Sequence, residues 1–237
     1  MPTPPAETRR LYRQIAEQIS RLIESGEAGI GARLPSERDL AERLGVSRPS
    51  VREAIIALEV EGAVEVRGGA GVFVLERRPA PREPLPQHTP GPFDVIRARW
   101  IIESEAAALA AQQAKAEHLQ RLKLALREMR EHPNHTSEGI AADQRFHLCI
   151  AEASGNAALL MVVQQLWEQR TGPLYLQLES HFSGRTIWRE AVTEHEALLD
   201  AIASREPDAA REAMRLHMKN AELRFASNWK SQDTPAG

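Results

Sequence analysis

The chain has 237 residues, 42% of them hydrophobic and 27% charged, which is ordinary for a soluble globular protein of one or two domains. Its 30 basic and 33 acidic side chains give a net charge of −3, which argues against nonspecific coating of nucleic acid. The sequence contains no apolar run long enough to span a bilayer and no signal-peptide pattern at its start. The single Cys149 excludes an internal disulfide, and these features together predict a cytoplasmic protein with no membrane partner.

The N-terminal third is predicted to hold three short helices. Apolar residues at helical spacing predict the first helix over about 9–25. Ser36 is suited to cap the second helix, and Gly45 is suited to end it in a left-handed conformation. Ser47 is suited to cap the third helix, whose first turn tolerates Pro49 because the missing N–H would be unpaired there. The short turn between the last two helices predicts a helix-turn-helix.

The third helix and the residues after it have the chemistry of a DNA-binding surface. Hydroxyl and guanidinium groups lie on the exposed side of its N-terminal end: Ser47, Arg48, Ser50 and Arg52. Arginine can bond guanine with two hydrogen bonds, and serine can bond phosphate. Residues 64–74 alternate apolar and polar on both sides of a glycine-rich tip, which predicts a β-hairpin wing carrying Arg67.

The run LPSERDLAERLGVSRPSVREAIIALEVEGAVEVRGGAGVFV resembles the winged helix-turn-helix of the GntR family of bacterial transcription regulators, over about residues 9–76. The resemblance implies contacts with double-stranded operator DNA from the following residues: Arg38, Ser47, Arg48, Ser50, Arg52, Gly68 and Gly69. A domain with balanced charge needs two copies for tight binding, so we expect a homodimer on a palindromic operator. The alternative for Arg38 and Arg52 is a solvated helix face paired with nearby glutamates.

A proline-rich stretch separates this region from the rest of the chain, and such stretches act as semi-rigid spacers. We therefore predict a winged helix-turn-helix domain over 8–77, a linker over 78–92 and an all-helical domain over 93–229. Helical periodicity with no strand pattern predicts six helices in the last domain: 93–114, 117–131, 137–154, 156–180, 184–204 and 207–228. The predicted fold class is mainly α, a winged helix-turn-helix with a small β-hairpin followed by a six-helix bundle.

One acid and three histidines carry the chemistry of the helical domain. Asp143 and His147 are one helical turn apart, so their side chains share a face. His195 and His217 lie on or beside the apolar stripes of the last two predicted helices. If the four converge, they form a donor set for zinc, nickel, manganese or iron, with positions left for an anionic ligand. The alternative for each histidine is a hydrogen-bonded residue of the core.

The segments FDVIRARWIIESEAAALAA, DQRFHLCIAEASGN and EHEALLDAIASREPDAAREAMRLHM resemble the FCD effector domain of the FadR-type branch of the GntR family. In that domain an aspartate and three histidines bind a metal, which binds a carboxylate effector. The resemblance therefore implies a metal site, with zinc favoured, at these residues: Asp143, His147, His195 and His217.

An arginine just before the glutamate of the first helix often binds the effector in this branch, which points to Arg99 and, after it, Arg97. The alternative for Arg99 is an ion pair with Glu103, one turn away. The stretch RARWIIESEAAALAA is similar to regulators that respond to hexuronates and related sugar acids. This similarity implies a hydroxylated carboxylate rather than a fatty acyl chain.

These features predict a sequence-specific transcription regulator, a repressor rather than an enzyme, whose operator affinity is controlled by a small carboxylate bound at a metal. Three alternatives remain: a metal-responsive regulator in which the metal itself is the signal, a metalloenzyme tethered to DNA, and a purely structural metal. The metalloenzyme alternative lacks a general base, because Glu194 and Glu196 flank His195 but point away from its helix face.

Overall fold

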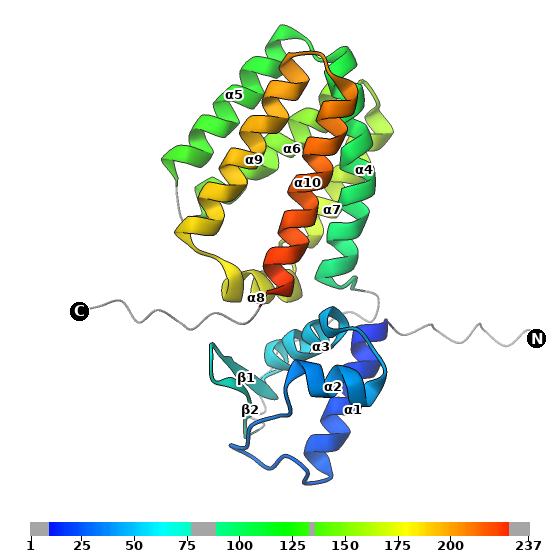
Figure 1. Cartoon of the computed structure of the whole chain (residues 1–237), viewed down its shortest axis with the longest axis vertical. Coiled ribbons are helices and arrows are strands. Elements are labelled where there is room, and N and C mark those ends of the chain that lie inside the picture. Colours follow the sequence, from blue (N-terminus) through cyan, green and yellow to red (C-terminus); the bar gives the residue numbers. More distant parts are fainter. Residues whose placement is uncertain (1–9, 77–88, 133–135, 228–237) are drawn as a thin grey trace, which may run out of the picture. The chain divides into compact units, whose positions relative to one another are not determined.

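The computed structural model describes residues 10–76, 89–132 and 136–227. Within them lie ten helices and one antiparallel two-stranded sheet, which confirms the mainly helical fold class (Figure 1). No helix in these ranges has the length and apolar character needed to cross a membrane. Most of the predicted linker, residues 77–88, lies outside the described residues, as do the chain ends at 1–9 and 228–237.

The chain divides into two compact units. Of the described residues, one unit contains 10–76, 89–92 and Pro173–His181, and the other contains 93–132, 136–172 and Phe182–Ser227. The first unit holds the elements of the predicted DNA-binding domain: α1 (Leu11–Glu24), α2 (Glu37–Leu44), α3 (Arg48–Val60), β1 (Val64–Arg67) and β2 (Gly71–Val74). Helices α1 and α2 both pack against α3, and their apolar faces enclose a core around Ile19, Leu40 and Ile55.

The predicted caps set the helix-turn-helix geometry. The Ser36 hydroxyl accepts a hydrogen bond from the Asp39 backbone N–H at 3.2 Å, so α2 begins where its sequence predicts. Gly45 ends α2 with a φ of 66°, a left-handed conformation that favours glycine. The Ser47 hydroxyl accepts from the Ser50 N–H at 3.2 Å and starts α3. The two helices are therefore fixed at both sides of a three-residue turn.

Strands β1 and β2 form the predicted wing. Val64 is opposite Val74 and Arg67 is opposite Gly71, so alternate valines face the core of the unit. Gly69 at the tip has a φ of 72°, which a residue with a side chain rarely adopts. The hairpin thus presents a narrow glycine tip beyond the packed strands.

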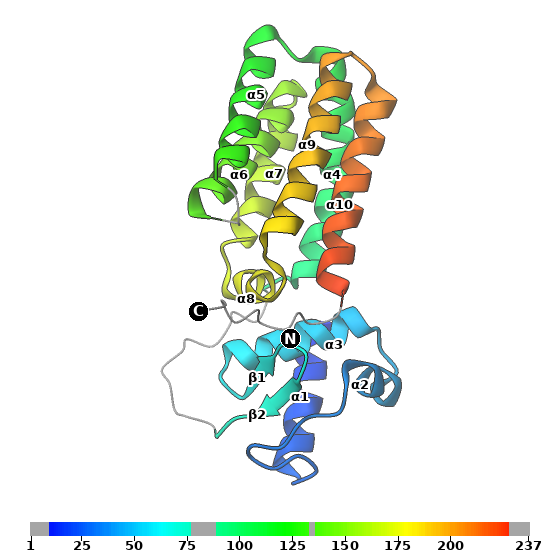
Figure 2. The ribbon, with the colours of Figure 1, turned by 60° about the vertical axis from the view of Figure 1, so that its left-hand side comes forward.

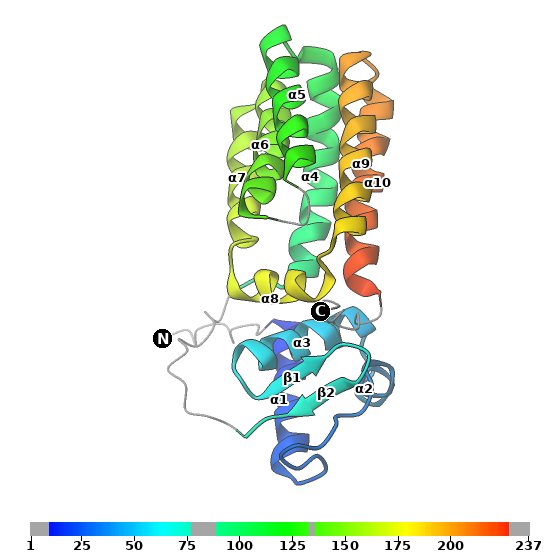
Figure 3. The same ribbon diagram turned by 90° about the vertical axis from the view of Figure 1, so that its left-hand side faces the viewer.

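The second unit is a bundle whose helices run side by side (Figures 2 and 3). Its helices have the following bounds: α4 (Pro92–Gln113), α5 (Ala116–Glu131), α6 (Ser137–Ala153), α7 (Ala157–Gln169), α9 (Arg185–Ala203) and α10 (Pro207–Ala226). Helix α5 packs against α6 and α9, and α9 packs against α10. Leu122, Phe146 and Leu198 are fully buried in its core. The arrangement brings residues of α4, α6, α9 and α10 to the bundle interior.

The prediction of one helix over 156–180 was wrong. Helix α7 ends at Gln169, and a separate helix α8 (Pro173–Phe182) follows it. Proline cannot continue a helix, because its ring clashes with the preceding turn and it has no N–H to donate. Gly172 caps the new helix in an extended conformation. In the part of the chain that the structure describes, seven helices therefore follow the predicted linker, rather than the six that the sequence predicts.

Candidate functional site

The surface predicted to contact DNA has exposed polar groups at the start of α3. Ser47 and Arg48 are exposed, and the Ser47 and Ser50 hydroxyls are hydrogen-bonded to each other at 2.8 Å. Arg38 on α2 has 82% of its side chain exposed. Arg67 on the wing is exposed as well, and it forms an ion pair with Glu65 at 2.7 Å. These side chains are available to a ligand outside the protein.

Arg52 differs from the other predicted DNA contacts because it is 2% exposed. Its Nε lies 2.6 Å and its Nη2 lies 2.5 Å from the two carboxylate oxygens of Glu37. Glu37 is itself buried and also lies 3.6 Å from Arg48. The pair joins α2 to α3, so a DNA contact from Arg52 stays a prediction that requires the pair to open.

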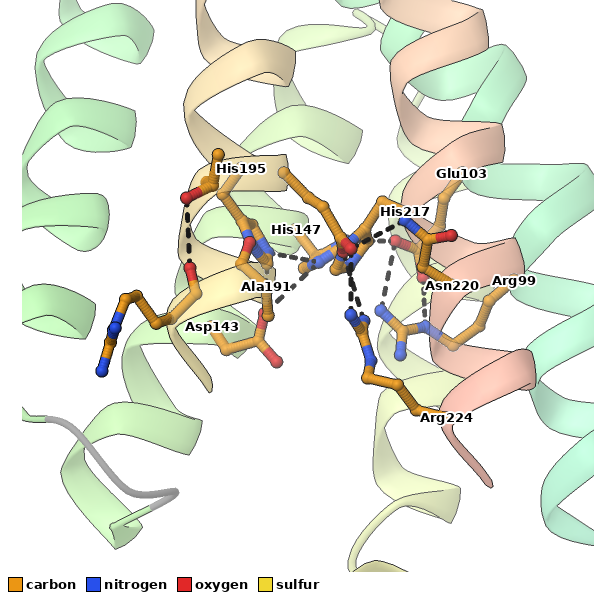
Figure 4. Close-up of polar contacts among 12 residues, drawn as sticks. Arg99, Glu103, Asp143, His147, Ala191, His195, His217, Asn220 and Arg224 are labelled. Atoms are coloured by element: carbon orange, nitrogen blue, oxygen red, sulfur yellow. Dashed lines mark hydrogen bonds and ion pairs between the residues drawn. The ribbon is translucent and has the colours of Figure 1, made fainter. Parts of the chain in front are cut away.

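The four predicted metal ligands gather in the interior of the bundle (Figure 4). Asp143 and His147 come from successive turns of α6, His195 from α9 and His217 from α10, and all four are buried. The three histidines each offer a ring nitrogen, and these nitrogens lie within 4.8 Å of one another. The Nε2 atoms of His147 and His195 are 3.1 Å apart, and Asp143 Oδ1 lies 3.0 Å from the latter.

Each histidine is held at its other ring nitrogen. His147 Nδ1 bonds the Glu103 carboxylate, His195 Nδ1 donates to the Ala191 carbonyl at 2.6 Å, and His217 Nδ1 donates to Glu194 Oε2 at 2.7 Å. A carbonyl or an ionised carboxylate can only accept, so the proton of each neutral ring is on Nδ1. In its neutral form each ring therefore has its lone pair on Nε2, and the Nε2 atoms of His147 and His195 face each other at the centre.

The pKa values of the groups around the site show which of them are charged. Burial raises the pKa of Glu103, but the opposing effect of the positive charges of Arg99 and His147 is larger and brings this pKa down to about 2. Burial likewise raises the pKa of Asp143, whose contacts with His147 and His195 hold it well below its usual value. Burial and the charge of His195 lower the pKa of His217 to about 3, so this ring is neutral at pH 7. Burial lowers the pKa of His147, but its contacts with Glu103 and Asp143 raise it above its usual value, so without a cation this ring favours a second proton. A cation at the centre would take the place of that proton beside the ionised carboxylates.

A divalent cation fits this donor set. Ring nitrogens of the three histidines lie within 4.8 Å of one another, with Asp143 Oδ1 beside His147 and His195, and the lone pairs of neutral rings that face one another repel unless a cation lies among them. Three imidazoles and one carboxylate make a mixed nitrogen and oxygen set of the kind that first-row metals prefer. Partners fixed at each outer nitrogen are also typical of histidines that bind metal.

Several residues around the site were not assigned from the sequence. Arg170, at the end of α7, bonds Asp143 Oδ2 at 2.9 Å and leaves Oδ1 for the centre. The guanidiniums of Arg99 and Arg170 both lie over the buried Trp167 ring, at 4.3 and 4.4 Å. Glu194 faces His217 across two helices, 23 residues away in the chain, and no spacing in the sequence indicates that contact. The Arg99–Glu103 spacing did indicate an ion pair, but not its bond to His147.

The predicted effector-binding arginines have different surroundings. Arg99 is 3% exposed, and its Nε lies 2.5 Å from Glu103 Oε1, so its guanidinium is beside the metal ligands but already paired. Arg97 is exposed and pairs with Glu222 at 3.1 Å. Of the two predicted effector-binding arginines, only Arg99 therefore lies among the buried residues around the predicted metal ligands.

A helix-turn-helix with a wing, followed by a helical bundle with a buried polar centre, defines a DNA-binding transcription regulator. The family model for the gntR family of bacterial regulatory proteins matches residues 11–74, and the FCD domain model matches residues 94–220. The chain belongs to the GntR family and carries an FCD domain, as the sequence motifs predict.

Curated relatives match the chain over most of its length. It is 36% identical to the Uxu operon transcriptional regulator of Escherichia coli K12 over 225 residues, which cover 91% of this chain and 87% of the relative. It is 37% identical to the Exu regulon transcriptional regulator of the same organism, with 92% and 85% covered. The matched domains and relatives are transcription regulators, so the chain is a DNA-binding regulator and not an enzyme.

A solved structure supports the fold alone. A GntR family member from Pseudomonas syringae pv. tomato DC3000 aligns with a TM-score of 0.51 at 23% identity, covering 94% of this chain and 86% of that one.

Proposed function

We propose that this regulator binds a palindromic operator as a homodimer and that a small carboxylate, a sugar acid, changes its operator affinity by binding at a metal in the bundle. The observation that carries the proposal is the convergence of ring nitrogens from three buried histidines, with Asp143 Oδ1 3.0 Å from His195 Nε2. A divalent cation bound at this centre would place concentrated positive charge in a buried site, where it would attract an anion strongly.

Zinc is the metal we propose, with nickel, manganese and iron as the other candidates, because imidazole nitrogen and carboxylate oxygen suit all four. The residues that would hold it are the four of the centre: Asp143, His147, His195 and His217. The bound metal would supply positive charge for an effector carboxylate. Arg170 would keep Asp143 oriented through its bond to Oδ2.

The effector class is supported by likeness. The chain is similar to the Uxu operon and Exu regulon regulators, and its α4 sequence resembles that of regulators that respond to hexuronates. We propose a hydroxylated carboxylate of that kind. Arg99 lies beside the centre and would share its guanidinium between Glu103 and the effector, which a bidentate donor can do. Arg97, on the exposed side of the same helix, is the secondary candidate.

On the DNA side, we propose phosphate and base contacts from the start of α3, from α2 and from the wing: Arg38, Ser47, Arg48, Ser50, Arg67, Gly68 and Gly69, with Arg52 added if its ion pair opens. Two copies would place two recognition helices in successive major-groove half-sites. We propose that the protein is a cytoplasmic repressor and that the acid releases it from DNA. This requires the acid to bind the DNA-free and DNA-bound states unequally.

A thermal-shift screen tests this proposal. Zinc-loaded and chelated protein are melted with hexuronates, other hydroxy acids and fatty acids, since a ligand of the native state raises the melting temperature by mass action. We expect a rise with one sugar acid that is lost on chelation and reduced in Arg99→Ala. An equal rise in chelated protein would contradict a metal-bound effector.

A second candidate is a metal-responsive regulator, in which the divalent metal itself is the signal. One observation favours it: the guanidiniums of Arg99, Arg170 and Arg224, which lie around the centre, are already bonded to carboxylates. In the same screen, a rise with zinc that no acid increases, together with zinc-dependent operator binding, would support this candidate over the first.

A further inference from the structure

Glu194 occupies a junction between α9 and the C-terminal half of α10. Its Oε2 accepts from His217 Nδ1 at 2.7 Å and from Arg224 Nη2 at 3.2 Å. Its Oε1 accepts from Asn220 Nδ2 at 2.8 Å and from Arg224 Nη1 at 2.9 Å. Figure 4 shows Arg224 and Asn220 on the same side of α10 as His217. One carboxylate therefore joins three residues spread over two turns of α10.

The contacts of Glu194 determine the orientation of the His217 ring and which of its two nitrogens carries the proton. Each carboxylate oxygen of Glu194 accepts a hydrogen bond from the Arg224 guanidinium, which cannot accept in return, so the geometry is that of an ionised carboxylate paired with arginine. An ionised carboxylate cannot donate, so the proton of the neutral His217 ring must be on Nδ1. The lone pair is then on Nε2, which faces His147 and His195. Without Glu194, the ring could rotate or carry its proton on Nε2.

The other two histidines have their own anchors, which makes Glu194 specific to His217. His147 depends on Glu103, and His195 depends on a backbone carbonyl that no substitution removes. Changing Glu194 should therefore disturb one ligand of the centre and leave the other two in place.

We infer that Glu194 is a positioning residue that fixes the orientation and tautomer of His217 and thereby sets the affinity of the centre for its metal. The inference rests on the metal site of the proposed function. Glu194 does not touch the converging Nε2 atoms, so it acts through His217. Carboxylates in this position change metal affinity by about 10- to 100-fold in metalloproteins.

The chain offers a matched control two residues away. Glu196 is on the same helix, but its carboxylate bonds Arg130 at 2.6 Å and is partly exposed. Glu194→Gln and Glu196→Gln therefore make the same chemical change on the same helix, and only the first alters the environment of His217.

The test measures zinc affinity of the full chain by competition with a chromophoric chelator at pH 7. We expect Glu194→Gln to bind zinc about 10- to 100-fold more weakly than the wild type, and Glu196→Gln to match the wild type. If the wild type binds zinc and Glu194→Gln binds it equally well, this inference is overturned while the metal site stands. If the wild type binds no divalent metal, the proposed site itself fails.

A second measurement needs no variant and guards against a misfolded one. Nitrogen-15 NMR of the histidine rings in metal-free wild-type protein reports which ring nitrogen carries the proton. We expect His217 to be protonated on Nδ1, as its bond to Glu194 requires. A ring protonated on Nε2 would overturn the inference, because Glu194 would then not fix the tautomer.

Discussion

At the scale of single residues, Arg52 separates a structural role from a DNA-binding role. It is buried against Glu37, whereas Arg38 on α2 is exposed. Removing one partner of a buried ion pair leaves the other charge uncompensated, so Arg52→Gln should lower the free energy of unfolding by about 3 kcal/mol in chemical denaturation. Arg38→Gln should leave it unchanged within about 0.5 kcal/mol.

The Arg38 variant also tests DNA binding separately from stability. If Arg38 contacts the operator, Arg38→Gln should weaken operator binding by about tenfold at unchanged stability, measured by fluorescence anisotropy. Equal stability of Arg52→Gln and wild type would show that the Glu37 pair does not hold α2 to α3.

Glu103 gives a prediction for acid stability. Its pKa in the folded protein is about 2, below the usual 4.5, so its contribution is complete above about pH 4.5 and is lost as the pH falls toward 2. The shift corresponds to a contribution on the order of 3 kcal/mol. Denaturant unfolding of the chelated protein should therefore show stability falling over this range, and Glu103→Gln should flatten the fall. An equally steep fall in the variant would assign the acid sensitivity to other carboxylates.

The residue scale also shows what the sequence could not indicate about the site. Asp143 and His147 share a helix, so their common face follows from the helical period. The bond between Glu194 and His217 depends on the rotation of α9 against α10, which no local pattern encodes. Glu194 was expected to point away from the face of His195, and its contact with His217 on α10 is compatible with that expectation.

At the scale of secondary structure elements, Gly45 is the residue whose conformation matters most for the helix-turn-helix. Its φ is 66°, and an added Cβ would meet no atom within 4 Å, so backbone strain is the only cost of a side chain there. Gly45→Ala should lower the free energy of unfolding by about 1 kcal/mol. Gly29 is also open to an added Cβ and has no such φ, so Gly29→Ala should cause no comparable loss. Equal losses in both would show that the left-handed C-cap is not the cause.

The sequence predicted most elements because local signals agree with the packing. Ser36, Gly45 and Ser47 are cap residues by chemistry alone, and they cap as predicted. The error over 156–180 arose because apolar residues at helical spacing resume at Leu174, and the prediction carried the helix across the polar turn and the Gly172–Pro173 break between the two apolar stretches. Proline in the first turn of a helix and proline that breaks one look similar in a sequence, and here it starts α8.

At the scale of the whole molecule, two units must communicate if a sugar acid is to change operator affinity. Binding of two half-sites requires two recognition helices, so we predict that light scattering gives twice the 26.4 kDa mass of one chain. A monomer at the concentrations that bind the operator would contradict the homodimer and leave one half-site per protein.

The most direct test of the account is operator binding of zinc-loaded and chelated protein with and without a hexuronate. A duplex selected by the protein from a random pool serves as the labelled operator, and fluorescence anisotropy gives its affinity. We predict that the acid weakens binding at least fivefold in the zinc-loaded protein, as expected for allosteric coupling of about 1 kcal/mol or more, and has no effect after chelation or in His217→Ala. An acid response that survives chelation, or none in the zinc-loaded protein while zinc alone changes the affinity, would contradict a metal-anchored effector.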